Sequence, residues 1–130
     1  MKFSFSNKEK LKSKKHIDVL FTEGKSCSKY PLKMIYTTTD FIDDVPIKAG
    51  VSVSKRNFKK AVDRNKIKRL LRECYRLNKH IIFNDLDKKY VCMFLYLGRE
   101  IPKFHDLNQK MERLLLDFKS KEINNTSVQK

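Results

Sequence analysis

Residues 61–77 read AVDRNKIKRLLRECYRL, and the spacing of their apolar side chains predicts an amphipathic helix. At about 100° per residue, one side of this helix is apolar and carries Ile67, Leu70, Leu71, Cys74 and Leu77. The other side is polar and carries Arg64, Asn65, Lys68, Arg69, Arg72, Arg76 and Lys79. Because the apolar side needs a sheet to cover, we expect the cationic side to face solvent as a rigid array.

The flanking sequence predicts the strands of that sheet. Residues 32–39 and 49–54 are rich in β-branched and aromatic residues, and residues 90–97 form a continuous apolar run that is typical of a buried strand. We therefore expect an α+β fold, a single-domain α/β sandwich. Its sheet has about four strands, and its elements follow the order α-β-β-β-α-β-α.

Two further helices are expected. The first begins at Ser13 and ends at Gly24, where a left-handed cap costs little. Its apolar residues share one face, namely Ile17, Leu20 and Phe21. The last helix occupies about residues 103–119 and follows a proline.

A length of 130 residues fits one domain. We expect a flexible segment at residues 1–10, a folded domain at residues 11–119 and a polar, disordered tail at residues 120–130. The basic segment at residues 55–80 is helical by pattern, and its start is expected between the candidate caps Asn57 and Asp63.

The chain carries 30 Lys and Arg against 15 Asp and Glu, a formal net charge of +15. This excess favours a polyanionic partner, which is a nucleic acid, an anionic membrane surface or an acidic protein. A basic surface without a specific site is the remaining alternative. Much of the excess lies in eleven cationic residues: Lys55, Arg56, Lys59, Lys60, Arg64, Lys66, Lys68, Arg69, Arg72, Arg76 and Lys79.

Four of these cations follow one another at intervals of one helical turn: Arg64, Lys68, Arg72 and Arg76. Like charges at this spacing repel by about a few tenths of a kcal/mol per pair, so a helix that only faces water usually interleaves acids. We interpret the array as a surface that phosphate groups fill. Asn65 is a candidate contact to a base edge, a backbone group or a hydrated metal, and an ordinary exposed asparagine is the alternative.

Other function classes are disfavoured. The longest apolar stretch, residues 91–97, is too short to span a membrane, and no signal peptide is visible, so we expect a cytoplasmic protein without a membrane partner. The three cysteines lack any Cys-x-x-Cys spacing and are expected to be reduced and structural, namely Cys27, Cys74 and Cys92.

No catalytic side chain is predicted. The histidines stand far apart in the sequence, at His16, His80 and His105. Three aspartates share a proline-containing turn, at Asp40, Asp43 and Asp44, and are expected to shape that turn rather than to bind metal.

The basic helix carries a family resemblance. Residues 61–73 resemble the signature of the protein component of bacterial ribonuclease P, the ribonucleoprotein that removes the 5′ leader from precursor tRNA. Residues 50–56 resemble the strand that leads into that helix, and residues 11–26 resemble the family's first helix and its exit. In the order of its elements, the resemblance covers residues 11–116.

The resemblance implies a protein subunit that binds the catalytic RNA and the 5′ leader of precursor tRNA, with one protein per RNA. The RNA subunit then carries out the hydrolysis with Mg²⁺, and the protein holds no metal tightly by itself. The residues implied in RNA binding are Lys55, Arg56, Arg64, Asn65, Lys66, Lys68, Arg69, Arg72 and Arg76. Asn65 is also the candidate for an indirect metal contact. Lys66 stands where many members have Arg, which keeps the charge but loses the planar fork.

The family also has a cleft between the first helix and the sheet, where the single-stranded leader lies. Phe21 matches a family aromatic on which a base stacks, and Ile17 stands where another aromatic is common. A place in the core is the alternative for Phe21. In the first β-like run, the residues facing the leader are either Lys33 with Ile35 or Met34 with Tyr36.

Two other functions fit the same helix. A structural RNA-binding protein of ribosomal type would share the basic helix but lack a leader site. A basic amphipathic helix on an anionic membrane is disfavoured because its apolar side chains are needed to cover the sheet.

Overall fold

The computed structural model describes residues 5–124. Within this range, four α-helices surround a four-stranded sheet, which confirms the expected α+β fold and the order of its elements. The elements in chain order are η1 (Asn7–Glu9), α1 (Lys14–Glu23), β1 (Lys25–Lys29), β2 (Leu32–Thr38), β3 (Ile47–Val53), α2 (Ala61–Asn78), α3 (His80–Phe83), β4 (Tyr90–Tyr96), α4 (Phe104–Lys119) and η2 (Ser120–Asn124).

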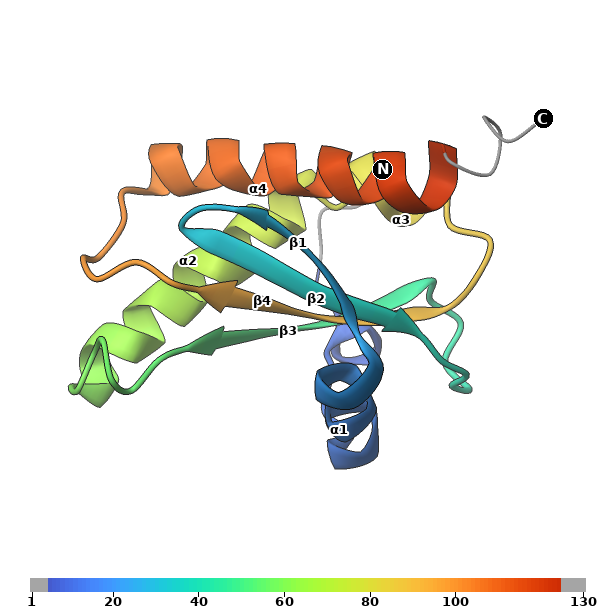
Figure 1. Cartoon of the computed structure of the whole chain (residues 1–130), viewed down its shortest axis with the longest axis horizontal. Coiled ribbons are helices and arrows are strands. Elements are labelled where there is room, and N and C mark those ends of the chain that lie inside the picture. Colours follow the sequence, from blue (N-terminus) through green and yellow to red (C-terminus); the bar gives the residue numbers. More distant parts are fainter. Residues whose placement is uncertain (1–4, 125–130) are drawn as a thin grey trace.

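The sheet has the strand order β1-β2-β4-β3. β1 and β4 both pair with β2 in antiparallel fashion, whereas β3 and β4 run parallel. Because parallel neighbours need a crossover connection, α2 and α3 carry the chain from the end of β3 back to the start of β4. Figure 1 shows α4 along one face of the sheet and α1 beneath the other.

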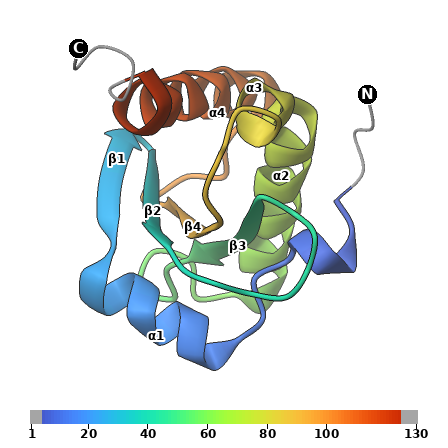
Figure 2. The same ribbon diagram turned by 90° about the vertical axis from the view of Figure 1, so that its right-hand side faces the viewer.

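The two faces of the sheet are covered by different helices (Figure 2). The larger apolar cluster lies under α2 and α4 and takes Leu32, Met34 and Tyr36 from β2. The smaller cluster lies under α1 and contains Leu20, with Ile35 packed against its margin. β4 contributes alternate residues to both clusters, which explains why its sequence is apolar throughout.

The exit from α1 differs from the expected left-handed cap. Gly24 has φ −70° and ψ 145°, which is extended backbone. A glycine is nevertheless required, because a Cβ at this position would overlap the carbonyl oxygen of Leu20 and lie 2.6 Å from Cγ2 of Ile35. The start of α1 agrees with the prediction, since the Ser13 hydroxyl accepts a hydrogen bond from the His16 amide at 3.3 Å.

Both ends of the described chain are packed where the sequence predicts disorder. Residues 5–10 lie against β3, and Glu9 is buried among them. Beyond α4, the helical turn η2 directs the Glu122 carboxylate to the hydroxyl groups of Tyr36 and Tyr90, each donating at 3.0 Å. The remainder of the predicted flexible segment and tail, residues 1–4 and 125–130, lies outside the described residues.

The cysteines all occupy the protein interior, at Cys27, Cys74 and Cys92, and none forms a disulfide. Their burial agrees with the structural role expected of them. Among the helices of residues 5–124, none is long and apolar enough to cross a membrane.

Candidate RNA interface

α2 begins at Ala61, within the expected interval of residues 57–63, and its N-cap is Lys60 rather than one of the two candidate caps. Lys60 makes no capping hydrogen bond through its side chain. Asp63 instead lies in the first turn, where the helix dipole favours a carboxylate. Asn57 anchors the preceding loop, because its side-chain amide donates to the carbonyl oxygen of Gly98 at 3.3 Å.

Arg64 is partly committed to that same loop. Its Nη1 donates to the carbonyl oxygens of Phe58 and Lys59 at 2.8 Å and 3.0 Å. The guanidinium therefore supports the entry to α2. Beside it, Lys55 and Arg56 are exposed in the loop between β3 and α2.

The cationic side of α2 is only partly as predicted. Lys66, Arg69 and Arg72 are exposed together with Asn65, and Lys68 is half-buried at the margin. Lys79, which the helical projection places on this side, is instead 5% exposed and forms an ion pair with Glu9. The projection fails there because α2 ends at residue 78 and the chain turns into α3.

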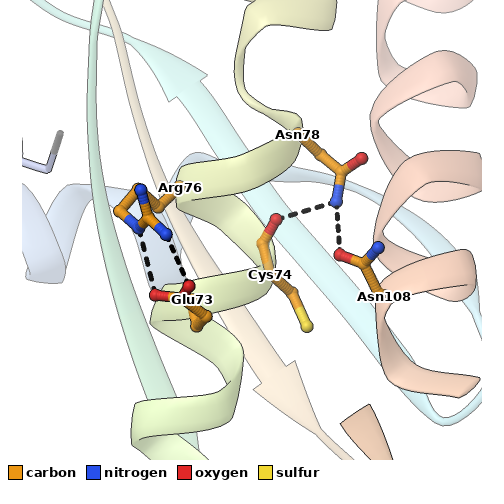
Figure 3. Close-up of polar contacts among 5 residues, drawn as sticks. All are labelled: Glu73, Cys74, Arg76, Asn78 and Asn108. Atoms are coloured by element: carbon orange, nitrogen blue, oxygen red, sulfur yellow. Dashed lines mark hydrogen bonds and ion pairs between the residues drawn. The ribbon is translucent and has the colours of Figure 1, made fainter. Parts of the chain in front are cut away.

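The positive charge of Arg76 is balanced by a neighbouring carboxylate. Its Nε and Nη2 donate to the two carboxylate oxygens of Glu73 at 3.0 Å and 2.5 Å, a bidentate pair (Figure 3). These hydrogen bonds lower the pKa of Glu73 and raise the pKa of Arg76. The repulsion expected along the helix is thus relieved at its C-terminal half.

Four cations of α2 make neither an ion pair nor a side-chain hydrogen bond within residues 5–124: Lys66, Lys68, Arg69 and Arg72. We call these four residues the cationic face. On the opposite, buried side of α2, Asn78 links this helix to α4. Its side-chain amide donates at 2.8 Å both to the carbonyl oxygen of Cys74 and to Oδ1 of Asn108 on α4 (Figure 3). The face is therefore presented by a helix that cannot rotate freely on the core.

A cleft of about 310 Å³ opens between α1, the sheet and α2. Its floor includes Ile17 of α1 and Val51 and Met93 of the sheet, and cations line its margin, namely Lys10, Lys12 and Arg72. Arg72 thus belongs both to the cationic face and to the cleft, so the two surfaces adjoin.

Among the predicted leader-binding residues, one lies in this cleft. Ile17 lines it directly. Ile35 is half-buried beside α1, and Lys33 shares its face of β2, in one row across the sheet with Leu95. Phe21 is 57% exposed at the end of α1, which excludes the alternative that it is a core residue.

The prediction that Tyr36 faces the leader is wrong. Tyr36 is 2% exposed on the opposite face of the sheet, where its ring meets Phe118 edge-on with 4.7 Å between centroids. Met34 is fully buried on that face as well. The register of β2 therefore leaves Lys33 and Ile35 on the side of α1. Burial and the hydrogen bond to Glu122 raise the pKa of the Tyr36 hydroxyl.

Sequence reasoning missed the cleft residues that lie before α1. Phe5, Lys10 and Lys12 line the cleft, although this part of the sequence is largely polar. The alternation of Phe3 and Phe5 is a weak signal for docking on a sheet, and Phe3 lies outside the described residues.

Among residues 5–124 there is no group of three His, Cys, Asp or Glu residues that could bind a metal ion. Asp43 pairs with Lys48, which lowers the pKa of its carboxyl group, and Lys89 donates to two carbonyl oxygens of the same loop. Asn65 is exposed among the cations of α2.

Comparison with known proteins identifies the family. A model of the Ribonuclease P family matches residues 5–119. The chain belongs to the ribonuclease P protein family. A ribonuclease P protein component from Porphyromonas gingivalis is 34% identical over 117 residues, covering 88% of this chain and 85% of that protein. One from Chlorobium phaeobacteroides is 33% identical over 135 residues, covering 92% and 91%.

Solved ribonuclease P proteins share the fold. The Staphylococcus aureus protein superposes with a TM-score of 0.69 at 22% identity, covering 85% of this chain and 95% of that one. The Thermotoga maritima protein superposes with a TM-score of 0.64 at 24% identity, covering 85% and 94%. The resemblance drawn from residues 61–73 is thereby confirmed at the level of family and fold.

Proposed function

We propose that this chain is the protein subunit of a ribonuclease P that matures the 5′ end of tRNA, and that it binds two RNAs at adjoining surfaces. The catalytic RNA lies on the cationic face of α2, and the 5′ leader of precursor tRNA lies in the cleft beside α1. Arg72 carries this proposal, because it is exposed on α2 and also lines the cleft.

The cationic face suits a structured RNA. Its four cations stand on one rigid helix without carboxylate partners in residues 5–124, so phosphate groups are their natural counterions. The guanidinium groups of Arg69 and Arg72 offer the planar forks that match a phosphate in two hydrogen bonds. Lys55, Arg56 and Arg64 extend the same charge to the loop before the helix.

The cleft suits a single strand. An apolar floor accepts bases with little preference for sequence, and cations along the margin accept the backbone phosphates. Ile17 supplies part of that floor, and Phe21, one helical turn further along α1, offers an exposed ring. A leader that leaves the tRNA at Arg72 would pass from the catalytic RNA directly into the cleft.

The hydrolysis belongs to the RNA subunit in this proposal. Mg²⁺ bound by RNA phosphates supplies the activated water and stabilises the leaving oxygen. The protein binds and orients both RNAs, and its positive charge reduces the repulsion between them. Asn65 contributes an indirect contact to a hydrated ion. One protein acts with one RNA in the cytoplasm.

The direct test compares the affinity of the holoenzyme for precursor tRNA and for mature tRNA. We expect tighter binding of the precursor, with the difference lost when the protein is omitted. Equal affinities with protein present would refute the leader cleft and favour a structural RNA-binding protein of ribosomal type.

A further inference from the structure

The N-terminal segment, residues 5–12, follows the outer edge of β3. Lys10 forms a parallel bridge with Ala49, and the amide of Leu11 donates to the Ala49 carbonyl oxygen at 2.9 Å. Figure 2 shows this part of the chain running from beside α2 to the start of α1. The segment thus spans the two helices that flank the cleft.

A buried ion pair holds the segment in place. The Glu9 carboxylate pairs with the Lys79 ammonium group at the end of α2, 70 residues further along the chain, and each residue is 5% exposed. The second carboxylate oxygen of Glu9 accepts from the amide and hydroxyl of Ser6 at 3.2 Å and 3.1 Å. The ammonium nitrogen of Lys79 lies 4.6 Å from the ring centroid of Phe83. A buried charge is strongly disfavoured without its partner, so these contacts specify one position for the segment.

In that position the segment presents its own side chains to the cleft. Phe5 packs edge-on against Tyr75 of α2, with 5.5 Å between ring centroids, and the Lys10 ammonium lies 5.7 Å from the Phe5 ring. Phe5, Lys10 and Lys12 then line the cleft together with Arg72. The three cations place positive charge beside the apolar side chains of the cleft, where the backbone phosphates of a single strand can pair with it.

We propose that Glu9 and Lys79 are positioning residues, which fix the N-terminal segment as a further wall of the cleft so that Lys10 and Lys12 bind phosphates of the leader. This inference rests on the proposed function of the cleft. Lys79 acts on the leader through the segment and makes no contact with RNA, because its ammonium group is enclosed by Glu9 and Phe83.

The first test removes the two lysines. The holoenzyme is assembled with Lys10→Ala/Lys12→Ala, and its affinities for precursor and mature tRNA are measured over a range of salt concentrations. Precursor affinity should fall by about threefold to tenfold, as for two exposed ion pairs. Its salt slope should fall by about 1.4, or about 0.7 for each contact with a single strand. Mature tRNA binding should be unchanged.

A matched control removes the same charge outside the cleft. Lys8 and Lys14 are exposed neighbours that do not line it, so Lys8→Ala/Lys14→Ala should keep the preference for precursor. An equal loss in this control would mean that only net charge matters and would overturn the proposal.

The second test breaks and then replaces the ion pair. Glu9→Gln should reproduce the loss of precursor preference with both lysines present, and should speed amide exchange in residues 5–12 more than in the core of α2. Glu9→Leu/Lys79→Met puts an apolar pair at the same place, which often supports a fold as well as a buried ion pair does. This double variant should restore the preference.

The outcomes distinguish this proposal from the proposed function of the cleft, on which it rests. If the Lys10/Lys12 variant keeps the full precursor preference while Phe21→Ala loses it, the cleft binds the leader and the segment is not part of it. If neither variant changes the preference, the cleft does not bind the leader at all, and the proposed function fails with the inference.

Discussion

On α2, the neighbours of each cation decide which of them are available to RNA. Arg64 supports the loop before the helix, Arg76 is held by Glu73, and Lys79 is enclosed with Glu9. A helical projection treats these side chains as equal. The contacts leave Lys68, Arg69 and Arg72 of that projected side available. Lys66, which is also exposed, completes the cationic face, and Arg69 and Arg72 supply its two guanidinium groups.

Arg69→Ala should therefore weaken binding of the catalytic RNA and lower the slope of log affinity against log salt concentration by about 0.9, the value for one phosphate contact with a duplex. Binding titrations at several salt concentrations measure both quantities. Arg113→Ala, which removes an exposed arginine from α4, is the matched control and should leave the slope unchanged. An unaltered slope in the Arg69 variant would contradict its assignment to the interface.

Phe21→Ala should selectively weaken binding of precursor tRNA by about 1–3 kcal/mol, the range for loss of one stacked base. Assembly with the catalytic RNA should be unaffected, because Phe21 lies on α1 and is 57% exposed. Leu116→Ala is a suitable control, since it removes an exposed apolar residue from α4. Equal weakening for mature tRNA would argue against a leader contact.

At the scale of single helices and strands, the sequence predicted the elements whose apolar residues recur at a regular spacing. The helix in residues 55–80, with its start expected between residues 57 and 63, the strand at 90–97 and the last helix agree with the structure to within a few residues, because each has a strong apolar pattern. In β2 both alternating sets contain apolar residues, so the pattern alone could not show that Tyr36 faces α4 and Ile35 faces α1. The packing of residues 5–10 depends on Lys79, a contact that no local pattern reveals.

The Glu73–Arg76 pair makes a prediction about α2 as a unit. Glu73→Gln removes the carboxylate that holds Arg76 in the bidentate pair and leaves the buried side of the helix intact. RNA affinity should rise, and the salt slope should steepen by up to about 0.9. Circular dichroism can verify that helix content is unchanged. Weaker binding in this variant would mean that Glu73 itself contacts the RNA.

At the scale of the whole molecule, the reactivity of the three buried cysteines shows whether the core is packed. Burial raises the pKa of Cys27 to about 11 and that of Cys74 to about 12, and it also raises the pKa of Cys92. At about pH 8, close to the pKa of a free thiol, a thiol reagent should not modify the folded protein and should modify all three cysteines in urea. Rapid labelling without denaturant would contradict the packing around the sheet.

The same burial makes stability fall at high pH. A thiol whose pKa is higher in the folded state favours folding while it is protonated, so this contribution is complete below the pKa of the unfolded thiol. It is lost progressively as pH rises from about 9 through the raised values of Cys27 and Cys74. Urea unfolding measured at several pH values should show a falling midpoint above about pH 9.

The molecule as a whole brings two surfaces together at Arg72, and the central claim is that they bind different RNAs. Because the native cysteines are buried, a photocrosslinker can be attached singly to Arg69→Cys or Phe21→Cys and the holoenzyme irradiated with precursor tRNA. We predict that position 69 crosslinks to the catalytic RNA and position 21 to the 5′ leader. Crosslinks from both positions to the catalytic RNA, with none to the leader, would contradict the account.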